Sequence, residues 1–314
     1  MIPKYSAKPV ADLDLLAKIL GITRQELDDL YHSSDSFFFL HERKEKSDGS
    51  FRDTYNVKKR LKLIHARISN KFLKKVYYPD YLQGSLKDKD FLTNIKNHLG
   101  KKILITEDIT NFFPSISKKV VFEVWAGFFK FSKDVSEYLA ELITFKGNLV
   151  QGGKASSYIC NLIFWSRESE LVSYLAKRGF TYTRYVDDIT VSANRIISSK
   201  EKKDIISRIY SLLKSVGAKP NRTKHHIMPR SEKQIMHNLN VNQNRPSMPK
   251  KKRNMIKAAV FECEKEFQTN ANSDKYLRLF NQTMGRVNHM KRMHPRIGDA
   301  LQKRLKLVKP QNKS

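Results

Sequence analysis

The sequence predicts an α+β fold, in which a mixed body of strands and helices is followed from Pro246 by an all-helical basic region. Three observations support this prediction. Strand-forming stretches flank two short turn sequences, at Asp48-Gly49 and Tyr185-Val186-Asp187-Asp188, as is typical of β-hairpins. Apolar residues recur at helical spacing in several long stretches. Lys and Arg dominate the last part of the chain.

The N-terminal part is expected to form two helices within residues 10–32. An apolar stripe marks the first helix, formed by Leu13, Leu16, Ile19 and Leu20. Gly21 ends that stripe, and Thr23-Arg24-Gln25-Glu26 is a capping box that opens the second helix. The hairpin around Asp48-Gly49 comes next, with strands at 37–40 and 51–55.

Helices and strands then alternate along the chain. Residues 57–76 repeat apolar positions at helical spacing and carry a basic outer face. A strand is expected at 103–106, running into Glu107-Asp108. Further helices are expected at 117–130, 132–145 and 154–177, and another runs from a capping box at Ser198-Ser199-Lys200-Glu201 to Gly217.

The composition indicates a globular protein with a polyanionic partner. Of the 314 residues, 40% are hydrophobic and 11% aromatic, and the formal net charge is +29. So large a charge disfavours a compact chain unless a polyanion screens it, and nucleic acid is the expected one. A membrane surface is the alternative, but no apolar run approaches the ~18 residues of a spanning helix.

The compartment follows from the termini and the cysteines. The first residues lack the apolar core of a secretory signal, so a cytoplasmic, bacterial-type protein is expected. Cys160 and Cys263 form no metal cluster and are expected to fill core space as reduced thiols.

Tyr185-Val186-Asp187-Asp188 is the most informative stretch, because it places two carboxylates at a hairpin tip. Neighbouring carboxylates repel each other, and a bound cation would neutralise their charge. Mg²⁺ is the expected cation, since it prefers hard oxygen ligands. Asp108, at the end of an apolar strand, could complete a three-acid site for two metal ions. Taken alone, the pair is equally typical of an ordinary turn, and Asp108 of a helix cap.

A glycine-rich loop lies between these acids in the sequence. Gly147 to Ser157 includes Gln151, Gly152 and Gly153 just before an expected helix. Paired glycines let a backbone approach a ligand closely, and Gln151 could touch a base or sugar. An ordinary loop-to-helix turn is the simpler interpretation of this stretch by itself.

The order of these motifs resembles that of reverse transcriptases, most of all the bacterial retron-type group. It consists of Asp108 with Phe112-Phe113, Gln151-Gly152, Tyr185-Val186-Asp187-Asp188 and Asn221-Arg222-Thr223-Lys224. Asn94-Ile95-Lys96-Asn97-His98 is similar to the retron Asn-Ala-x-x-His element without its alanine. The resemblance spans roughly residues 36–300.

The resemblance implies a right-hand polymerase with an antiparallel palm sheet. The expected segments are an N-terminal helical part at 1–35, fingers at 36–100, palm with inserted finger helices at 101–245, and a small basic helical thumb at 246–314. Catalysis is assigned to Asp108, Asp187 and Asp188, and the metal site to these acids with Ile109. The expected cofactor is two Mg²⁺ ions, with Mn²⁺ as a substitute.

Binding roles follow from the same resemblance. Nucleotide binding is assigned to Arg52, Phe113, Gln151, Gly152 and Lys224. Phe113 matches the residue that excludes a 2′-hydroxyl, and Lys224 matches a lysine near the triphosphate. RNA binding is assigned to Asn94, His98, Lys250, Lys251, Lys252, Arg253, Arg286, Lys291 and Arg292.

The implied activity is RNA-directed DNA synthesis from dNTPs on a cognate structured noncoding RNA, which serves as primer and template. The implied product is a branched RNA-linked single-stranded DNA (msDNA), made with an effector protein in anti-phage defence. Alternatives are a group II intron-like or other phage-defence reverse transcriptase, or an RNA-binding scaffold without catalysis. Three departures stand out: Gly153 to Ser157 lacks the usual prolines, Asn111 replaces a frequent acid, and Met236-His237-Asn238 replaces Val-Thr-Gly.

Overall fold

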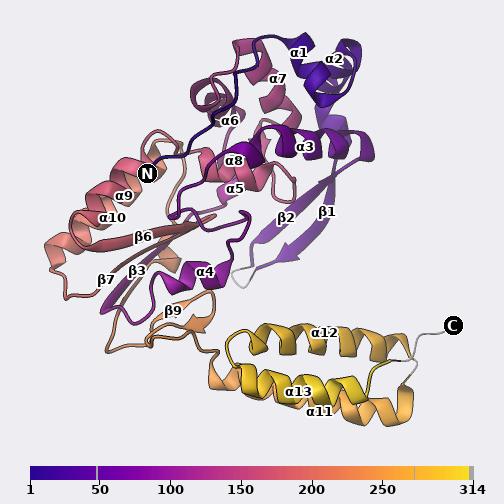
Figure 1. Ribbon diagram of the computed structural model, residues 1–314, viewed down its shortest axis with the longest axis vertical. Coiled ribbons are helices and arrows are strands. Elements are labelled where there is room, and N and C mark those ends of the chain that lie inside the picture. The colour runs from indigo at the N-terminus through magenta and orange to yellow at the C-terminus, as the bar shows by residue number, and fades with distance from the viewer. Residues whose placement is uncertain (47–48, 272, 311–314) are drawn as a thin grey trace. The chain divides into compact units, whose positions relative to one another are not determined.

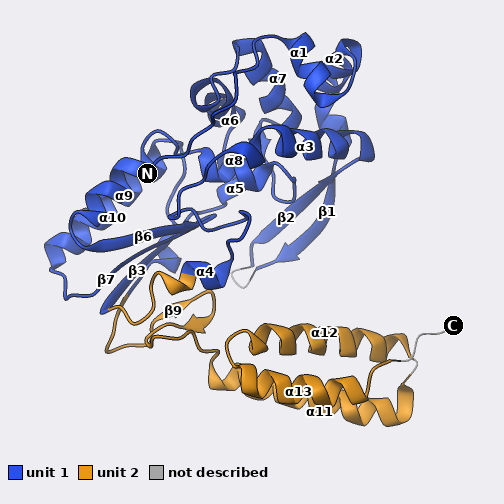
Figure 2. Ribbon diagram, in the orientation of Figure 1, with its two compact units in different colours: residues 1–94, 102–227 blue, residues 95–101, 228–314 orange. Residues whose placement is uncertain are grey.

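The computed structural model describes residues 1–46, 49–271 and 273–310. The chain divides into two compact units (Figure 2), residues 1–94 with 102–227 and residues 95–101 with 228–314. Since these units divide the chain more coarsely than fingers, palm and thumb, the four expected segments stay a prediction. No helix of the described residues is long and apolar enough to cross a membrane.

A four-stranded sheet organises the first unit (Figure 1). Its strand order is β6-β7-β3-β8, with β6 at Phe180–Tyr185, β7 at Asp188–Ala193, β3 at Ile103–Asp108 and β8 at His226–Pro229. β7 pairs antiparallel with both β6 and β3. The antiparallel register sets Asp108 of β3 opposite Asp188 of β7, so two expected site residues meet at one end of the sheet.

Helices and two small hairpins surround this sheet. The helices are α1 (Leu13–Leu20), α2 (Arg24–His32), α3 (Lys59–Lys71), α4 (Phe91–Lys96), α5 (Phe112–Ser115), α6 (Lys118–Glu123), α7 (Lys133–Ile143), α8 (Ser156–Leu162), α9 (Glu168–Ala176) and α10 (Ser199–Lys214). The hairpins are β1 (Phe38–Glu45) with β2 (Phe51–Val57), and β4 (Thr144–Phe145) with β5 (Asn148–Leu149). Asp48 lies outside the described residues.

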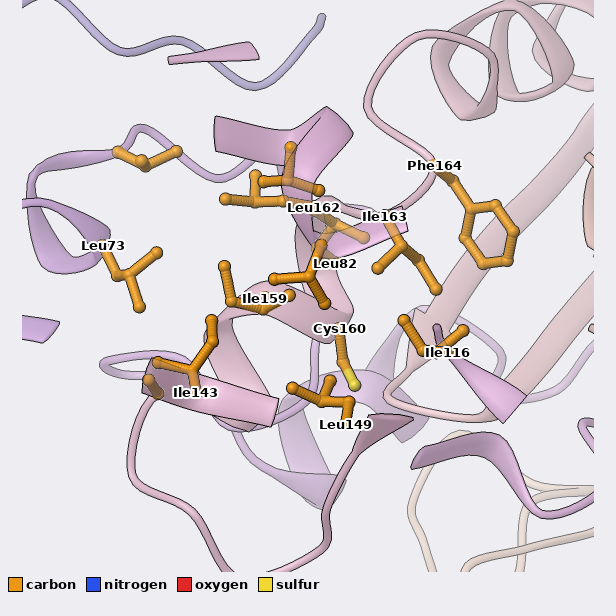
Figure 3. Packing of buried hydrophobic residues seen from close by; sticks show 14 of the residues in the cluster. Leu73, Leu82, Ile116, Ile143, Leu149, Ile159, Cys160, Leu162, Ile163 and Phe164 are labelled. Carbon is orange, nitrogen blue, oxygen red and sulfur yellow. The ribbon is translucent and has the colours of Figure 1, made fainter. Parts of the chain in front are cut away.

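One apolar core holds the first unit together. Figure 3 shows part of it, where Ile159 and Cys160 of α8 pack among residues such as Ile116 and Leu149. Cys160 is fully buried and free, as expected for a reduced thiol that fills core space. The core therefore fixes α8, and its backbone carbonyls, close to the central strands.

Several local expectations are confirmed. Both capping boxes form, at Thr23 with Glu26 and at Ser198 with Glu201. Gly21 ends α1 in the left-handed conformation, with φ 63°. The strand expected at 103–106 is present and continues to Asp108.

Three expected helices differ from the structure. The helix expected at 57–76 ends at Lys71, where Phe72 turns out of helical geometry. The one expected at 117–130 is α6 followed by a π-helical turn at Val124–Phe128. The single helix expected at 154–177 is instead two helices, α8 and α9. Backbone carbonyls at the end of α8 and Glu168 at the start of α9 all accept hydrogen bonds from the buried Arg184.

The second unit joins a small hairpin to a three-helix bundle. Strands β9 (Ile235–Met236) and β10 (Leu239–Asn240) are linked by His237 and Asn238, both at positive φ, so Met236-His237-Asn238 belongs to a tight hairpin turn. The bundle consists of α11 (Lys250–Asn270), α12 (Asp274–Lys291) and α13 (Pro295–Leu307). The expectation of a helical, basic C-terminal region is confirmed. Cys263 is buried and free in this bundle.

Candidate active site

The β6–β7 hairpin turns through only two residues, Val186 and Asp187, since Tyr185 pairs directly with Asp188. Val186 has φ 59°, a left-handed conformation that a β-branched residue rarely adopts. Positive φ at the first central position is typical of the mirror-image turns that join antiparallel strands. Such a strained turn persists only when its surroundings hold it.

The segment before α4 presses against this turn. Gln83 N donates to Arg184 O at 2.9 Å, and Arg184 N donates to Tyr81 O at 2.8 Å, so this segment runs along β6. A Cβ added at Gly84 would lie 2.4 Å from Cγ2 and 2.6 Å from N of Val186. Only glycine permits so close an approach to the hairpin tip.

Asp108 is held from the other side by the segment after α10. Asn221 N donates to Asp108 O at 2.7 Å, and Asn221 Nδ2 donates to Oδ2 at 3.1 Å. Lys224 Nζ lies 3.2 Å from both carboxylate oxygens of Asp108. Asp108 is buried, while Asp187 and Asp188 are half-buried. The structure thus brings together the three acids and Lys224.

The site carries more negative charge than its surroundings neutralise. Burial, together with the charges of Asp187 and Asp108, raises the pKa of Asp188 to about 7. Burial likewise raises the pKa of Asp187, with a contribution from Asp108, while the charges of Lys224 and Arg52 oppose the rise. The acids therefore form one electrostatically linked group, and Arg52 lies within its range.

The donor set fits a divalent cation. Three carboxylates that destabilise one another supply the hard oxygen ligands that Mg²⁺ prefers, and a cation would relieve their repulsion. Among the residues the structure describes, no three such side chains stand ready-made around a cation position. Lys224 instead contacts Asp108, and Asp188 hydrogen-bonds with Asp108.

The glycine-rich loop docks on the β1–β2 hairpin. Tyr55 N of β2 donates to Gln151 O at 2.8 Å. Gly152 has φ 110°, and an added Cβ would lie 2.2 Å from Tyr55 O. Both features require glycine at this position. Phe113 is half-buried in α5, with its ring edge-on to Phe112.

Arg52 is an exposed residue of β2, paired across the hairpin with Lys44 of β1. Lys46 Nζ, beyond the end of β1, donates to Asn111 Oδ1 at 3.3 Å, just before α5. Since Lys46 bonds to Asn111 and the charge of Arg52 acts on Asp187, the basic side chains of this hairpin extend toward the acidic site.

The residues assigned to RNA binding fall into two groups. Asn94 and His98 are buried: Thr183 Oγ1 donates to Asn94 Oδ1 at 2.6 Å, and burial lowers the pKa of His98 to about 3, leaving it neutral. Their placement favours a role inside the protein over direct RNA contact. The basic residues are accessible: Lys250, Lys251, Lys252, Arg286 and Arg292 are exposed, and Arg253 and Lys291 are half-buried.

Sequence reasoning missed Gly84, Glu168 and Arg184. Arg184 is fully buried in β6, where it bonds to Glu168 of α9. An arginine inside a strand-forming run was the available signal, since buried charges in strands need partners. Nothing local in the sequence marks Glu168 or Gly84, because their roles depend on tertiary contacts.

Comparisons with known proteins show the family of this chain. The model of the family described as "Reverse transcriptase (RNA-dependent DNA polymerase)" matches residues 44–253. The Retron Se72 reverse transcriptase of Salmonella heidelberg is 34% identical over 294 residues, which cover 93% of this chain and 78% of that protein. The Retron Ec48 reverse transcriptase of Escherichia coli is 30% identical, over 97% of this chain and 78% of that protein.

Among solved structures, an apo telomerase from Candida tropicalis aligns with a TM-score of 0.47 at 12% identity, over 92% of this chain and 68% of that chain. At that TM-score the likeness supports no conclusion about this chain. The family match covers most of the chain and includes the three acids, the Gln151-Gly152 loop and Lys224. The chain therefore belongs to the reverse transcriptase family, and to its retron type.

Proposed function

We propose that this reverse transcriptase copies a cognate structured noncoding RNA, which serves as both primer and template, into a branched RNA-linked single-stranded DNA (msDNA). The observation that carries the catalytic part is the meeting of Asp108, Asp187 and Asp188 at one end of the sheet, where burial and the neighbouring carboxylates raise the pKa values of Asp187 and Asp188. Such a group is suited to divalent cations and to the phosphates that accompany them.

Asp108, Asp187 and Asp188, with the backbone at Ile109, would hold two Mg²⁺ ions, or Mn²⁺ in their place. Bound ions would supply Lewis-acid stabilisation of the primer hydroxyl and the transferring phosphoryl group. The sheet register and the tight turn orient the carboxylates before any substrate arrives. The protein therefore contributes mainly positioning and electrostatics.

Basic and apolar groups around the acids would bind the nucleotide. Arg52 would bind the triphosphate, since its charge already acts on Asp187. The Lys224 ammonium, now on Asp108, would turn to the triphosphate and could protonate the departing pyrophosphate. Phe113 and the loop at Gln151-Gly152 would shape the pocket around the sugar and base.

The RNA partner is supported by charge and by the relatives. The net charge of +29 suits a polyanion, and the similar proteins named above are retron reverse transcriptases. The exposed basic residues of α11 and α12 would contact the RNA. By the same likeness, the chain would act with an effector protein in anti-phage defence.

Primer extension with Mg²⁺, dNTPs and an RNA template tests the catalytic proposal. The wild type should make DNA, and Asp187→Ala should abolish the product while RNA binding largely persists. No product from the wild type would instead favour an RNA-binding scaffold. Sequencing the nucleic acid that co-purifies with the protein tests the partner: a discrete short DNA joined to one structured RNA supports the proposal, and random cellular RNA without DNA contradicts it.

A further inference from the structure

We propose that Arg184 is a positioning residue, which fixes the peptide between Val186 and Asp187 and thereby orients the Asp187 carboxylate for metal binding. The inference rests on the proposed metal-dependent function of the acid site. Arg184 does not reach the substrate or the reacting atoms; it acts through the backbone of the turn two residues away.

All donors of the Arg184 side chain are used inside the protein. Nε and one terminal nitrogen bind the two carboxylate oxygens of Glu168, at 2.6 and 2.8 Å. The remaining bonds go to backbone carbonyls, those of Cys160 at 3.0 Å, Asn161 at 3.2 Å and Val186 at 3.0 Å. Five donors therefore tie together α8, α9 and the hairpin turn.

The ion pair is buried, with Arg184 0% and Glu168 1% exposed. Tyr182 adds a bond from its hydroxyl to Glu168 Oε1 at 2.8 Å, so the carboxylate is also held from β6. A buried pair by itself would serve only to connect helix and sheet. The bond to Val186 O distinguishes Arg184, because that oxygen belongs to the peptide that leads directly into Asp187.

The turn needs such a restraint. Val186 sits at φ 59°, a strained conformation for a β-branched residue, and a peptide free to flip would swing Asp187 away from Asp108. Arg184 holds the carbonyl of that peptide from one side, and Gly84 packs against Val186 N and Cγ2. The two contacts together leave the turn one orientation.

Lysine cannot replace this arginine. A guanidinium presents a rigid, planar fork that can bind a carboxylate with two bonds and still reach carbonyls on its other edge. An ammonium keeps the charge that Glu168 requires but lacks the fixed directions needed to reach Glu168 and Val186 O together. Arg184→Lys should therefore still neutralise the charge of Glu168 but no longer hold the turn in its orientation.

The test compares wild type, Arg184→Lys and a control, Ile209→Ala, which removes a buried side chain of α10 outside this network. The readouts are Mn²⁺ affinity from electron paramagnetic resonance, kcat and dNTP KM in primer extension, and thermal unfolding. Arg184→Lys should weaken Mn²⁺ binding and lower kcat about 10- to 100-fold, with dNTP KM little changed. Ile209→Ala should lower the unfolding temperature alone.

A second variant tests the same proposal if Arg184→Lys does not fold. Gly84→Ala leaves every Arg184 partner in place but pushes on Val186, so it should weaken Mn²⁺ binding as well. The proposal is overturned if a folded Arg184→Lys, or Gly84→Ala in its place, binds Mn²⁺ and turns over like the wild type. A wild type that binds Mn²⁺ but makes no DNA would contradict the proposed function and leave this inference standing.

Discussion

The β6–β7 and β1–β2 hairpins are built in opposite ways. The β6–β7 hairpin is buried along most of its length, and its acidic tip is clamped by Arg184 and Gly84. The β1–β2 hairpin is exposed along most of β1, and its register shifts between Leu40 and Glu42. The core holds the β6–β7 hairpin in one orientation, while the β1–β2 hairpin carries basic side chains on the protein surface.

The acids of the two hairpins show the same contrast. Asp188 is crowded by other carboxylates and its pKa rises to about 7, whereas Asp53 is bonded by Arg43 at 2.8 Å and its pKa falls. An acid whose environment destabilises its charge is poised to bind a cation, and an acid already paired is not. We therefore expect metal binding at β6–β7 and nucleotide phosphate binding at β1–β2.

The largest effect is expected for Asp188→Asn. Polymerase activity should fall by about 10³-fold or more in primer extension, because a ligand and its charge are removed. The metal-free protein should nevertheless become more stable at pH 8. Folded Asp188 keeps its proton up to about pH 7, whereas the unfolded chain loses it near the ordinary 3.8. The metal-free fold therefore loses stability as the pH rises from about 3.8 to about 7, and the full loss is present at pH 8.

The matched substitution Asp53→Asn should have the opposite effect on stability at pH 8. Its pKa is lowered by Arg43, so its ionised form is favoured by folding, and the substitution should not stabilise the protein at pH 8. Thermal unfolding of both variants in metal-free buffer at pH 5 and pH 8 measures the contrast. Equal shifts for the two variants would remove the distinction between the hairpins.

Gly152→Ala should disturb the contact between the loop and β2. The added Cβ would collide with Tyr55 O and would sit at φ 110°, so the variant should lose more than about 1 kcal/mol of stability and raise the dNTP KM. Gly147→Ala is the control, because Gly147 also has positive φ, at 75°, but open space around it. If both variants behave alike, the docking of the loop on β2 is unimportant.

Arg52→Ala tests the cationic hairpin. A lost charge-assisted bond to the triphosphate should raise the dNTP KM about 10- to 100-fold while Mn²⁺ affinity stays near that of the wild type. Lys44→Ala, at the directly paired position of β1, should change the dNTP KM much less. The assignment of Arg52 fails if the two variants give the same kinetics.

The smallest effect is expected far from both hairpins. Gly285 lies in the middle of α12 with nothing near its missing Cβ, so Gly285→Ala should stabilise the bundle by about 0.5–1 kcal/mol. Denaturant unfolding measures the change. A loss of stability would mean that the surface of α12 is not open at this position.

The sequence predicted the turns and helix caps that short-range interactions determine, and it missed the features that depend on tertiary contacts. Gly21, both capping boxes and the hairpin around Tyr185-Val186-Asp187-Asp188 follow short-range rules, and the structure contains all of them. The break between α8 and α9 was missed, because residues 154–177 fit one helix by their spacing, while the bonds from both helices to Arg184 depend on tertiary structure. Likewise, the three acids were identified by their motifs, but the clamp that orients them involves a glycine and an ion pair far away in the chain.

The central claim is that Asp108 and Asp188, eighty residues apart in the chain, serve one metal site. Mn²⁺ titrations of wild type, Asp108→Asn, Asp188→Asn and the double variant test it most directly. A shared site predicts that each single substitution removes most of the tight binding and that the double variant loses little more. Additive losses, or singles that bind like the wild type, would contradict it.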